Sequence, residues 1–268
     1  MATSTSQNVR PPAVAGLFYP GEKDTLSGEI LQLLRGAAAR GPAVPKALIA
    51  PHAGYMYSGP IAASAYALLA PVSDTIRRVV LLGPTHRVAV RGLALPSVSR
   101  FATPLGTIEL DRAALEKLKA MPQVVVSDDA HALEHSLEVH VPFLQKTLSD
   151  FKLVPLAVGH AKPEEVAAVL DELWGGPETL IVVSSDLSHY LAYTQAQGID
   201  RATAQAILEL RADIDHDQAC GATPVGGLAL AARRRQLKPE LLDLRNSGDT
   251  AGDKNRVVGY GAFAFYET

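Results

Sequence analysis

The chain of 268 residues contains a single cysteine, and this scarcity excludes a framework of intramolecular disulfides. A lone thiol also fits a reducing compartment. An excess of positive charge is missing too: the formal net charge is −3, which gives no general attraction to nucleic acid or to an anionic membrane. The one basic cluster, residues 233–235, lies at the end of a predicted helix, where cations complement the helix dipole. We interpret it as a solvated helix end and not as a phosphate site.

No apolar stretch approaches the length of a membrane span, and residues 1–8 lack the charged and then apolar pattern of a signal peptide. These absences predict a cytoplasmic protein with no membrane or nucleic-acid partner, whose residues 1–8 are disordered. The glycine-rich motifs for phosphates and dinucleotides are absent, and so is the nucleophile elbow of serine hydrolases. None of these familiar signatures therefore suggests the function.

Strand-like and helix-like segments alternate along the chain, and 47% of the residues are hydrophobic, enough for a substantial core. Continuous apolar runs near positions 48, 80 and 182 are typical of strands covered on both faces. We therefore predict a single α/β domain over residues 9–268, with a mostly parallel central sheet flanked by helices. The predicted strands are 46–50, 78–82, 93–96, 105–110, 123–127, 152–158, 179–184, 240–245 and 256–266. The predicted helices are 24–35, 59–70, 111–120, 163–174, 195–210 and 223–236, with Pro60 and Pro163 at first helical positions and Asp111 as an N-cap.

Three histidines come shortly after three of these apolar runs. His52 follows the run 47–50, His86 follows 79–82, and His189 follows 180–183. In an open α/β sheet ligands bind at the carboxyl ends of the strands, so the three histidines are expected to meet there. One such histidine would indicate an ordinary turn with a buried imidazole. Its repetition at three strand ends favours a common site.

The single cysteine, Cys220, stands in a Cys-Gly turn before a predicted helix and would complete a transition-metal site with these histidines. Imidazole is the commonest metal ligand, and a thiolate makes a softer site that suits iron, zinc or copper(I). We expect the helix N-terminus to lower the pKa of the thiol and to favour the thiolate. The alternative is a buried structural cysteine, which is the common fate of a free cysteine.

Asp186 and His189 are three residues apart, so one helical turn would bring them together. A carboxylate partner would fix the imidazole tautomer and suit His189 to acid–base catalysis or to ligation. The alternative is a capping aspartate beside a histidine with an ordinary partner. Ser185 lies next to this pair, which leaves a hydrolase as a further interpretation.

Residues 131–135 match the H-x-x-E-H pattern of inverted zinc peptidases. This pattern is short and requires a helix, which Pro142 limits. Glu134, His135 and Glu138 also form a dense polar group, in which the two glutamates are one helical turn apart. We expect these three side chains to support metal ligands at the cleft, with a solvated helix face as the alternative.

Six segments, taken in order, resemble the Memo family, also known as component B of the AmmeMemoRadiSam system. They are Arg-Pro-Pro-Ala-Val-Ala-Gly-Leu-Phe-Tyr-Pro at 10–20, Pro-His-Ala-Gly-Tyr at 51–55, Leu-Gly-Pro-Thr-His at 82–86, Glu-His-Ser-Leu-Glu-Val-His-Val-Pro-Phe-Leu at 134–144, Ser-Ser-Asp-Leu-Ser-His-Tyr at 184–190 and Cys-Gly at 220–221. Because the family segment begins at position 134, His131 lies outside it, which weakens the peptidase interpretation.

The resemblance implies the fold of the catalytic subunit of class III extradiol dioxygenases, which open catechol rings with non-haem Fe(II), two histidines and a glutamate. By motif, His52 and His86 match the histidine ligands, and His189 matches the acid–base histidine. Cys220 stands where those enzymes have the glutamate. Because a thiolate is softer and is itself oxidisable, the resemblance implies a metal site more firmly than a ring-cleaving reaction. The groups that it implies along the cleft are Tyr19, Tyr55, Tyr57, Glu134, His135 and Glu138.

The sequence thus predicts a metal-dependent oxidoreductase that holds Fe(II), or otherwise copper or zinc, at His52, His86 and Cys220. Dioxygen and a small molecule are the expected substrates, and Asp186 is expected to orient His189. Two alternatives remain. One is a non-catalytic metal- or peptide-binding module that partners a radical-SAM system, and the other is a zinc hydrolase.

Overall fold

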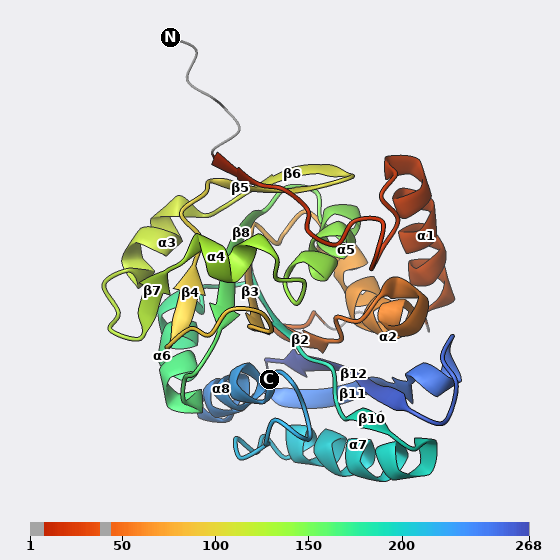
Figure 1. The fold of residues 1–268 in the computed structure, drawn as a ribbon. Coiled ribbons are helices and arrows are strands. Elements are labelled where there is room, and N and C mark those ends of the chain that lie inside the picture. The colour runs from red at the N-terminus through yellow and green to blue at the C-terminus, as the bar shows by residue number, and fades with distance from the viewer. Residues whose placement is uncertain (1–7, 38–43, 268) are drawn as a thin grey trace.

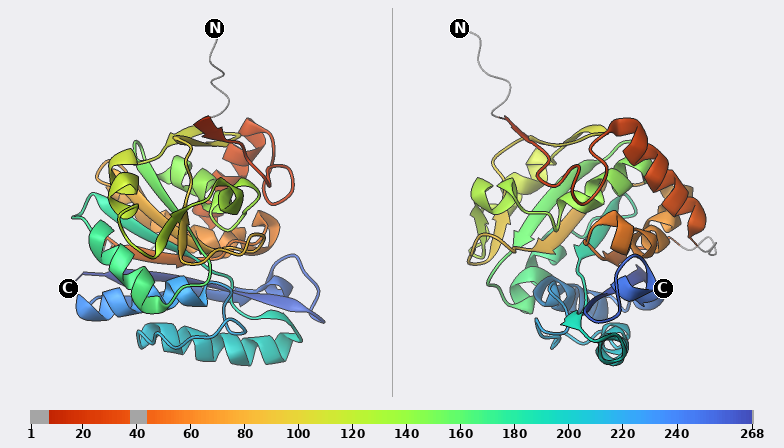
Figure 2. Two further views of the ribbon diagram at one scale, coloured as in Figure 1. Left: turned by 60° about the vertical axis from the view of Figure 1, so that its left-hand side comes forward. Right: turned by 45° about the vertical axis from the view of Figure 1, so that its right-hand side comes forward.

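A central sheet with helices on both faces forms the body of the molecule (Figures 1 and 2). The computed structural model describes residues 8–37 and 44–267. The predicted disordered start falls mainly on residues 1–7, which lie outside the described part. Asn8 is described, and its backbone and side-chain carbonyl groups accept hydrogen bonds from Ser99.

The main sheet has nine strands in the described part of the chain. They are β2 (Ala47–Ala50), β3 (Arg78–Pro84), β4 (Leu93–Leu95), β7 (Val124–Val126), β8 (Lys152–Val158), β9 (Thr179–Ser184), β10 (His189–Leu191), β11 (Lys238–Asn246) and β12 (Val257–Tyr266). A smaller sheet holds β1 (Val9–Arg10), β5 (Arg100–Thr103) and β6 (Gly106–Glu109). The α-helices are α1 (Lys23–Gly36), α2 (Tyr55–Tyr66), α3 (Arg112–Leu118), α4 (Asp128–Ala132), α5 (Val141–Thr147), α6 (Pro163–Leu173), α7 (Tyr193–Leu208) and α8 (Ala222–Arg234).

Four neighbouring strands, in the order β2, β9, β3 and β8, are parallel and form the centre of the main sheet. Antiparallel strands flank them: β12 pairs with β2, and β4 pairs with β8. The predicted single α/β domain is therefore confirmed, but the sheet is mixed: its centre and the edge pair of β4 and β7 are parallel, and the other pairings are antiparallel. The short connectors 85–92 and 247–256 explain this, because a parallel crossover needs a longer connection, usually an α-helix.

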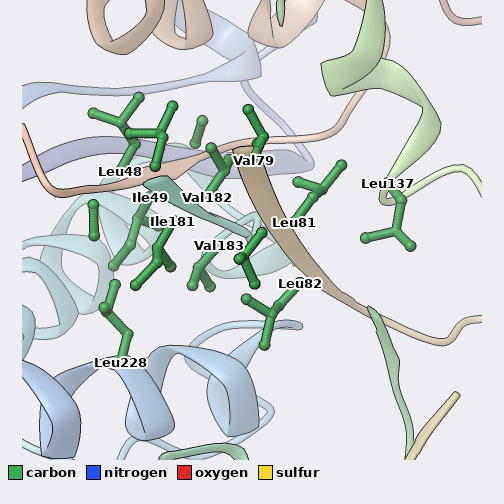
Figure 3. Close-up of a cluster of buried hydrophobic side chains, with 14 of the residues drawn as sticks. Leu48, Ile49, Val79, Leu81, Leu82, Leu137, Ile181, Val182, Val183 and Leu228 are labelled. Atoms are coloured by element: carbon green, nitrogen blue, oxygen red, sulfur yellow. The ribbon is translucent and has the colours of Figure 1, made fainter. Parts of the chain in front are cut away.

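Helices α1, α2 and α5 lie on one side of the sheet, and α6, α7 and α8 lie on the other (Figure 1). The central strands are buried on both faces, as their continuous apolar runs predict. Figure 3 shows Leu48 and Ile49 of β2, Ile181 and Val182 of β9, and Leu228 of α8 within this core. Such a core fixes where each central strand ends, and those ends position the candidate site.

Every predicted strand and helix corresponds to an element of the structure, and the capping signals at Asp111 and Pro163 are confirmed. The prediction that Pro60 begins a helix is wrong, because α2 starts at Tyr55 and Pro60 lies inside it. Backbone N–H groups of Tyr57 and Ser58 bond to the carbonyl of Gly54 and start the helix earlier. The short elements β1, β5, β10, α4 and α5 carried too little periodicity to be predicted.

The basic cluster ends α8 as predicted and is tied to α6. Arg234 and Arg235 each donate to Asp171 at 2.6 Å. No helix within residues 8–37 and 44–267 is both long and apolar enough to cross a membrane.

Candidate metal centre

Three side chains predicted to be metal ligands converge at the carboxyl edge of the sheet. His52 follows β2, His86 follows β3, and Cys220 precedes α8. Because β2 and β3 both pair with β9 in parallel, their carboxyl ends lie at one edge. One potential ligand atom from each of the three residues lies within 4.8 Å of the other two. The predicted convergence of His52, His86 and Cys220 is thus present in the fold.

A serine hydroxyl sets the tautomer of His52. Ser184 Oγ donates to the carbonyl of Ser136 at 2.6 Å, so it must accept the Nδ1 proton of His52, also at 2.6 Å. The Nε2 atom of His52 is therefore unprotonated, and it lies 3.4 Å from Cys220 Sγ. Burial, with a contribution from His86, lowers the pKa of His52 well below its usual range. His52 is consequently a neutral imidazole with a free lone pair on Nε2.

A buried carboxylate sets the tautomer of His86 in the same way. Glu134 accepts from the backbone N–H of His86 at 2.6 Å and from its Nδ1 at 2.9 Å. Burial alone would raise the pKa of Glu134, but hydrogen bonds from His135 and His86 outweigh burial and hold this pKa well below its usual range. An ionised carboxylate only accepts, so Nδ1 of His86 carries a proton, and in the neutral imidazole Nε2 is the nitrogen left free. Glu134 thus orients His86, which is one of the predicted ligands.

The third histidine of this cluster is His135 rather than His189. Its ring stacks on that of His86 with centroids 4.6 Å apart, and its Nδ1 lies 3.2 Å from Glu134 Oε1. The ring of His52 lies 5.4 Å away, in an edge-to-face arrangement. Ligand atoms of His86, Glu134 and His135 also lie within 4.8 Å of one another. One carboxylate therefore orients two stacked imidazoles beside the candidate metal position.

The thiol of Cys220 does not have the lowered pKa that its place before a helix predicts. Burial raises this pKa to about 12, and the carboxylate of Asp186 adds to the rise. The backbone N–H of Asp186 donates to Cys220 Sγ at 3.3 Å and opposes the shift without reversing it. The expected thiolate is therefore wrong for the metal-free protein. A metal ion would have to displace the thiol proton.

Asp186 and His189 are not joined by the expected helical turn. Residues 185–188 are irregular, and His189 begins β10, which pairs with β12. Asp186 Oδ1 accepts from the backbone N–H of His52 at 2.8 Å, and Oδ2 lies 4.0 Å from His52 Nε2. Burial raises the pKa of Asp186, against opposing effects of the His52 N–H and of His189. The carboxylate of Asp186 therefore makes its hydrogen bond with the backbone of His52 and not with His189.

Glu138 lies outside the ligand cluster and holds the N-terminal segment, residues 10–20. Its carboxylate accepts from Arg10 Nη1 at 2.6 Å, from the N–H groups of Ala13 and Val14 at 2.7 and 3.0 Å, and from Tyr19 OH at 2.6 Å. The predicted helical turn from Glu134 to Glu138 is wrong, because residues 133–137 are not helical. The two glutamates therefore point to different parts of the molecule.

Tyr19 and Tyr55, expected along the cleft, are buried. Tyr19 donates to Glu138, and Tyr55 donates to the carbonyl of Val139 at 2.7 Å. Both hydroxyls thus hold the loop that follows Glu134. Tyr57, at the start of α2, is half-buried.

The structure lacks the geometry that the inverted zinc-peptidase motif and a Ser185 nucleophile would each need. His131 is buried, its Nε2 lies 2.9 Å from the carbonyl of Ala94, and α4 ends at Ala132, so His131 and His135 do not share a helix face. The hydroxyl of Ser185 donates to the carbonyl of Asp186 at 2.7 Å and accepts from the N–H of Gly221. It therefore has no histidine base within hydrogen-bonding distance among the described residues.

The sequence patterns missed two histidines near the cluster. His160 and His216 line a cavity of about 470 Å³ that also reaches His86 and Cys220. A signal for His160 was present, because it follows the predicted strand 152–158 in the same way as the other histidines follow theirs. His216 lies in an irregular segment and carried no such signal.

The fold and the cluster define an α/β protein with a candidate metal centre at the carboxyl edge of its sheet. The chain belongs to the Memo-like protein family, whose pattern matches residues 10–264. A MEMO1 family protein of Aquifex aeolicus is 36% identical over 264 residues, which cover 94% of this chain and 97% of that protein. Those of Methanosarcina barkeri and Methanococcoides burtonii are 37% and 38% identical, each covering 95% of this chain and 98% of the relative.

Among solved structures, an uncharacterized protein of Escherichia coli K12 has a TM-score of 0.45 and 15% identity. The match covers 80% of this chain and 98% of that one, and the likeness is too slight to bear on function.

Proposed function

We propose that this protein is a metal-dependent oxidoreductase in which His52, His86 and Cys220 hold Fe(II), with copper or zinc as alternative ions. The observation that carries this proposal is the convergence of the three ligand atoms within 4.8 Å. In the neutral state both imidazoles carry the proton on Nδ1 and leave Nε2 free, which is the form that binds a metal. Two nitrogen donors and one sulfur donor fit a transition metal and leave coordination positions open.

Fe(II) bound there would supply Lewis acidity and one-electron redox chemistry toward dioxygen and a small substrate. The residues around the proposed ligands orient them and limit access to the site. Ser184 and Glu134 hold the two rings in one tautomer, while the buried position of His52 closes the site on that side. His86 and Cys220 face the cavity, so a substrate would approach from there. His189, at the start of β10, is proposed to hold and transfer a proton.

The proposal is tested by the metal content of protein purified without oxygen and reconstituted with Fe(II), Cu(I) or Zn(II). We expect about one tightly bound ion per chain, as in a site with three protein ligands. Oxygen consumption with a panel of catechols then tests the redox activity. Failure to retain any of the three ions would contradict the proposal and favour a non-catalytic module. A full metal complement without oxygen consumption would favour a metal-holding partner of a radical-SAM system.

Replacing Glu134 by glutamine is expected to weaken metal binding by roughly 10–100-fold, the usual cost of losing a carboxylate that orients a ligand histidine. The amide keeps one acceptor oxygen but loses the negative charge, and its NH2 group would face N–H groups that the carboxylate accepts. Competition with a chelator of known affinity measures the loss. Glu109→Gln, an exposed change in the smaller sheet, is the control. Equal affinity in the Glu134 variant would show that this carboxylate does not support the ligand.

A further inference from the structure

The cavity beside the ligand cluster is built from the carboxyl ends of two strands and the segment before α8. Its lining includes His86, Cys220, His160, His216 and Thr85. His86 follows β3, His160 follows β8, and these strands are parallel neighbours. The cavity therefore adjoins the proposed metal position on one side and two further histidines on another.

The backbone around His160 is fixed in place. Its N–H donates to the carbonyl of Val90 at 2.7 Å, and its carbonyl accepts from the N–H of Gly92 at 2.9 Å. A Cβ atom on Gly159 would lie 2.2 Å from the carbonyl oxygen of Val90, so only glycine permits this approach. The imidazole itself is exposed and has no hydrogen bond or ion pair with any residue in the described ranges. A rigid backbone thus presents a free imidazole to the cavity.

The second histidine of the lining, His216, is held by a contact with α8. Its Nε2 lies 3.3 Å from the hydroxyl of Thr223, in the first turn of α8. The side chain is exposed, so its second ring nitrogen remains accessible. The N-terminus of this 13-residue helix adds a partial positive charge at the same end of the cavity.

The lining is rich in hydrogen-bond donors and contains no carboxylate. Imidazole N–H groups and the hydroxyl of Thr85 face a ligand, while Ala89, Val90 and Val158 supply an apolar wall. His216 has an aspartate on each side in the sequence, but neither lines the cavity, and Asp215 accepts the N–H groups of Asp217 and Gln218 through Oδ1. Donors without a facing carboxylate favour an anionic ligand with an apolar body.

We propose that this cavity binds a compact organic acid, with its carboxylate recognised by His160 and His216 and its other polar end directed toward His86 and Cys220. The inference rests on the proposed function only in placing that second end at the metal. Recognition of the acid depends on side chains that hold no metal, so the two can be tested separately.

The test compares salicylate with its uncharged amide, salicylamide, by calorimetric titration of the metal-free and Zn(II)-loaded protein. We expect salicylate to bind about tenfold or more tightly than the amide, since a charge-assisted hydrogen bond is roughly twice as strong as a neutral one. In the double variant His160→Gln, His216→Gln this preference should disappear. Equal affinity of the native protein for both compounds would overturn the proposal.

Arg91→Gln provides a matched control, because this exposed cation lies next to His160 in a backbone bridge but does not line the cavity. It should keep the preference for salicylate, and an equal loss in this variant would assign the effect to general surface charge and contradict a specific site. Metal retention by the native protein separates the two proposals. Selectivity for salicylate in a native protein that retains none of the three ions would contradict the proposed function alone, and full metal loading without that selectivity would contradict this inference alone.

Discussion

Cys220→Ser is expected to abolish tight metal binding while leaving the fold intact. The serine hydroxyl stays protonated near neutral pH and is a far weaker ligand than a thiolate. Its loss should reduce metal affinity by more than the roughly 10–100-fold cost of removing a group that merely orients a ligand. Iron per chain after anaerobic reconstitution and dialysis measures the effect, and circular dichroism checks the fold.

Two further variants sharpen this experiment. Cys220→Asp replaces the thiolate by a carboxylate, and it should recover part of the metal while losing the absorption that a metal–thiolate bond gives. His216→Gln removes a histidine that lines the same cavity but is not a proposed ligand, so it should keep the full metal content. An unchanged iron content in Cys220→Ser would show that the sulfur is not a ligand.

Glu138→Gln should destabilise the protein by about 3–5 kcal/mol, the usual cost of removing one partner of a buried ion pair. The side chains of Arg10 and Glu138 are only 4% and 1% exposed, and their closest atoms are 2.6 Å apart. The amide would leave the Arg10 charge uncompensated and would turn an N–H group toward donors of Ala13, Val14 or Tyr19. Urea denaturation at neutral pH measures the change in free energy of unfolding.

A surface pair and a double-mutant cycle complete this test. Glu109→Gln breaks the exposed contact with Arg100 and should leave the unfolding midpoint unchanged within error. Arg10→Met combined with Glu138→Gln should cost less than the sum of the single changes, because the two side chains act as a unit. If Glu138→Gln unfolded at the same urea concentration as the native chain, its carboxylate would contribute nothing to the stability of the N-terminal segment.

The convergence of His52 and His86 could be predicted from the sequence because the signal was local and repeated. His52 and His86 each follow a continuous apolar run, and parallel strands bring such ends together without further information. The place of Cys220 was suggested by its rarity and by a family resemblance, since no strand leads to it. The same strand-end rule applied to 152–158 would have included His160.

The parts that the sequence did not predict depend on contacts between distant residues. Ser184 fixes the tautomer of His52 across 132 positions, and Glu138 holds Arg10 across 128. Nothing in the local pattern around Glu138 distinguishes an anchor for another segment from a group at the cleft. The thiol pKa was misjudged for a related reason, because helix position is visible in a sequence whereas burial beside Asp186 is not.

The short elements escaped prediction for a different reason. Segments such as α4 and β10 span five and three residues, less than is needed to display a helical or strand period. Their conformation is imposed by neighbours. His189, for example, takes extended geometry because β10 pairs with β12. A helical interpretation of Asp186 and His189 was therefore reasonable locally and wrong in context.

Because β12 lies between β11 and β2 in the sheet, β2 cannot complete its pairing during translation until β12 has been synthesised. Strand β2 leaves the ribosome early, yet its antiparallel partner ends only at Tyr266. At about 5–20 residues per second, the edge of β2 would wait roughly 10–40 s for that partner. During this interval an apolar strand has an unpaired edge, a known template for aggregation. Nascent chains stalled before residue 257 should therefore engage chaperones, and release of the last strand should end that dependence.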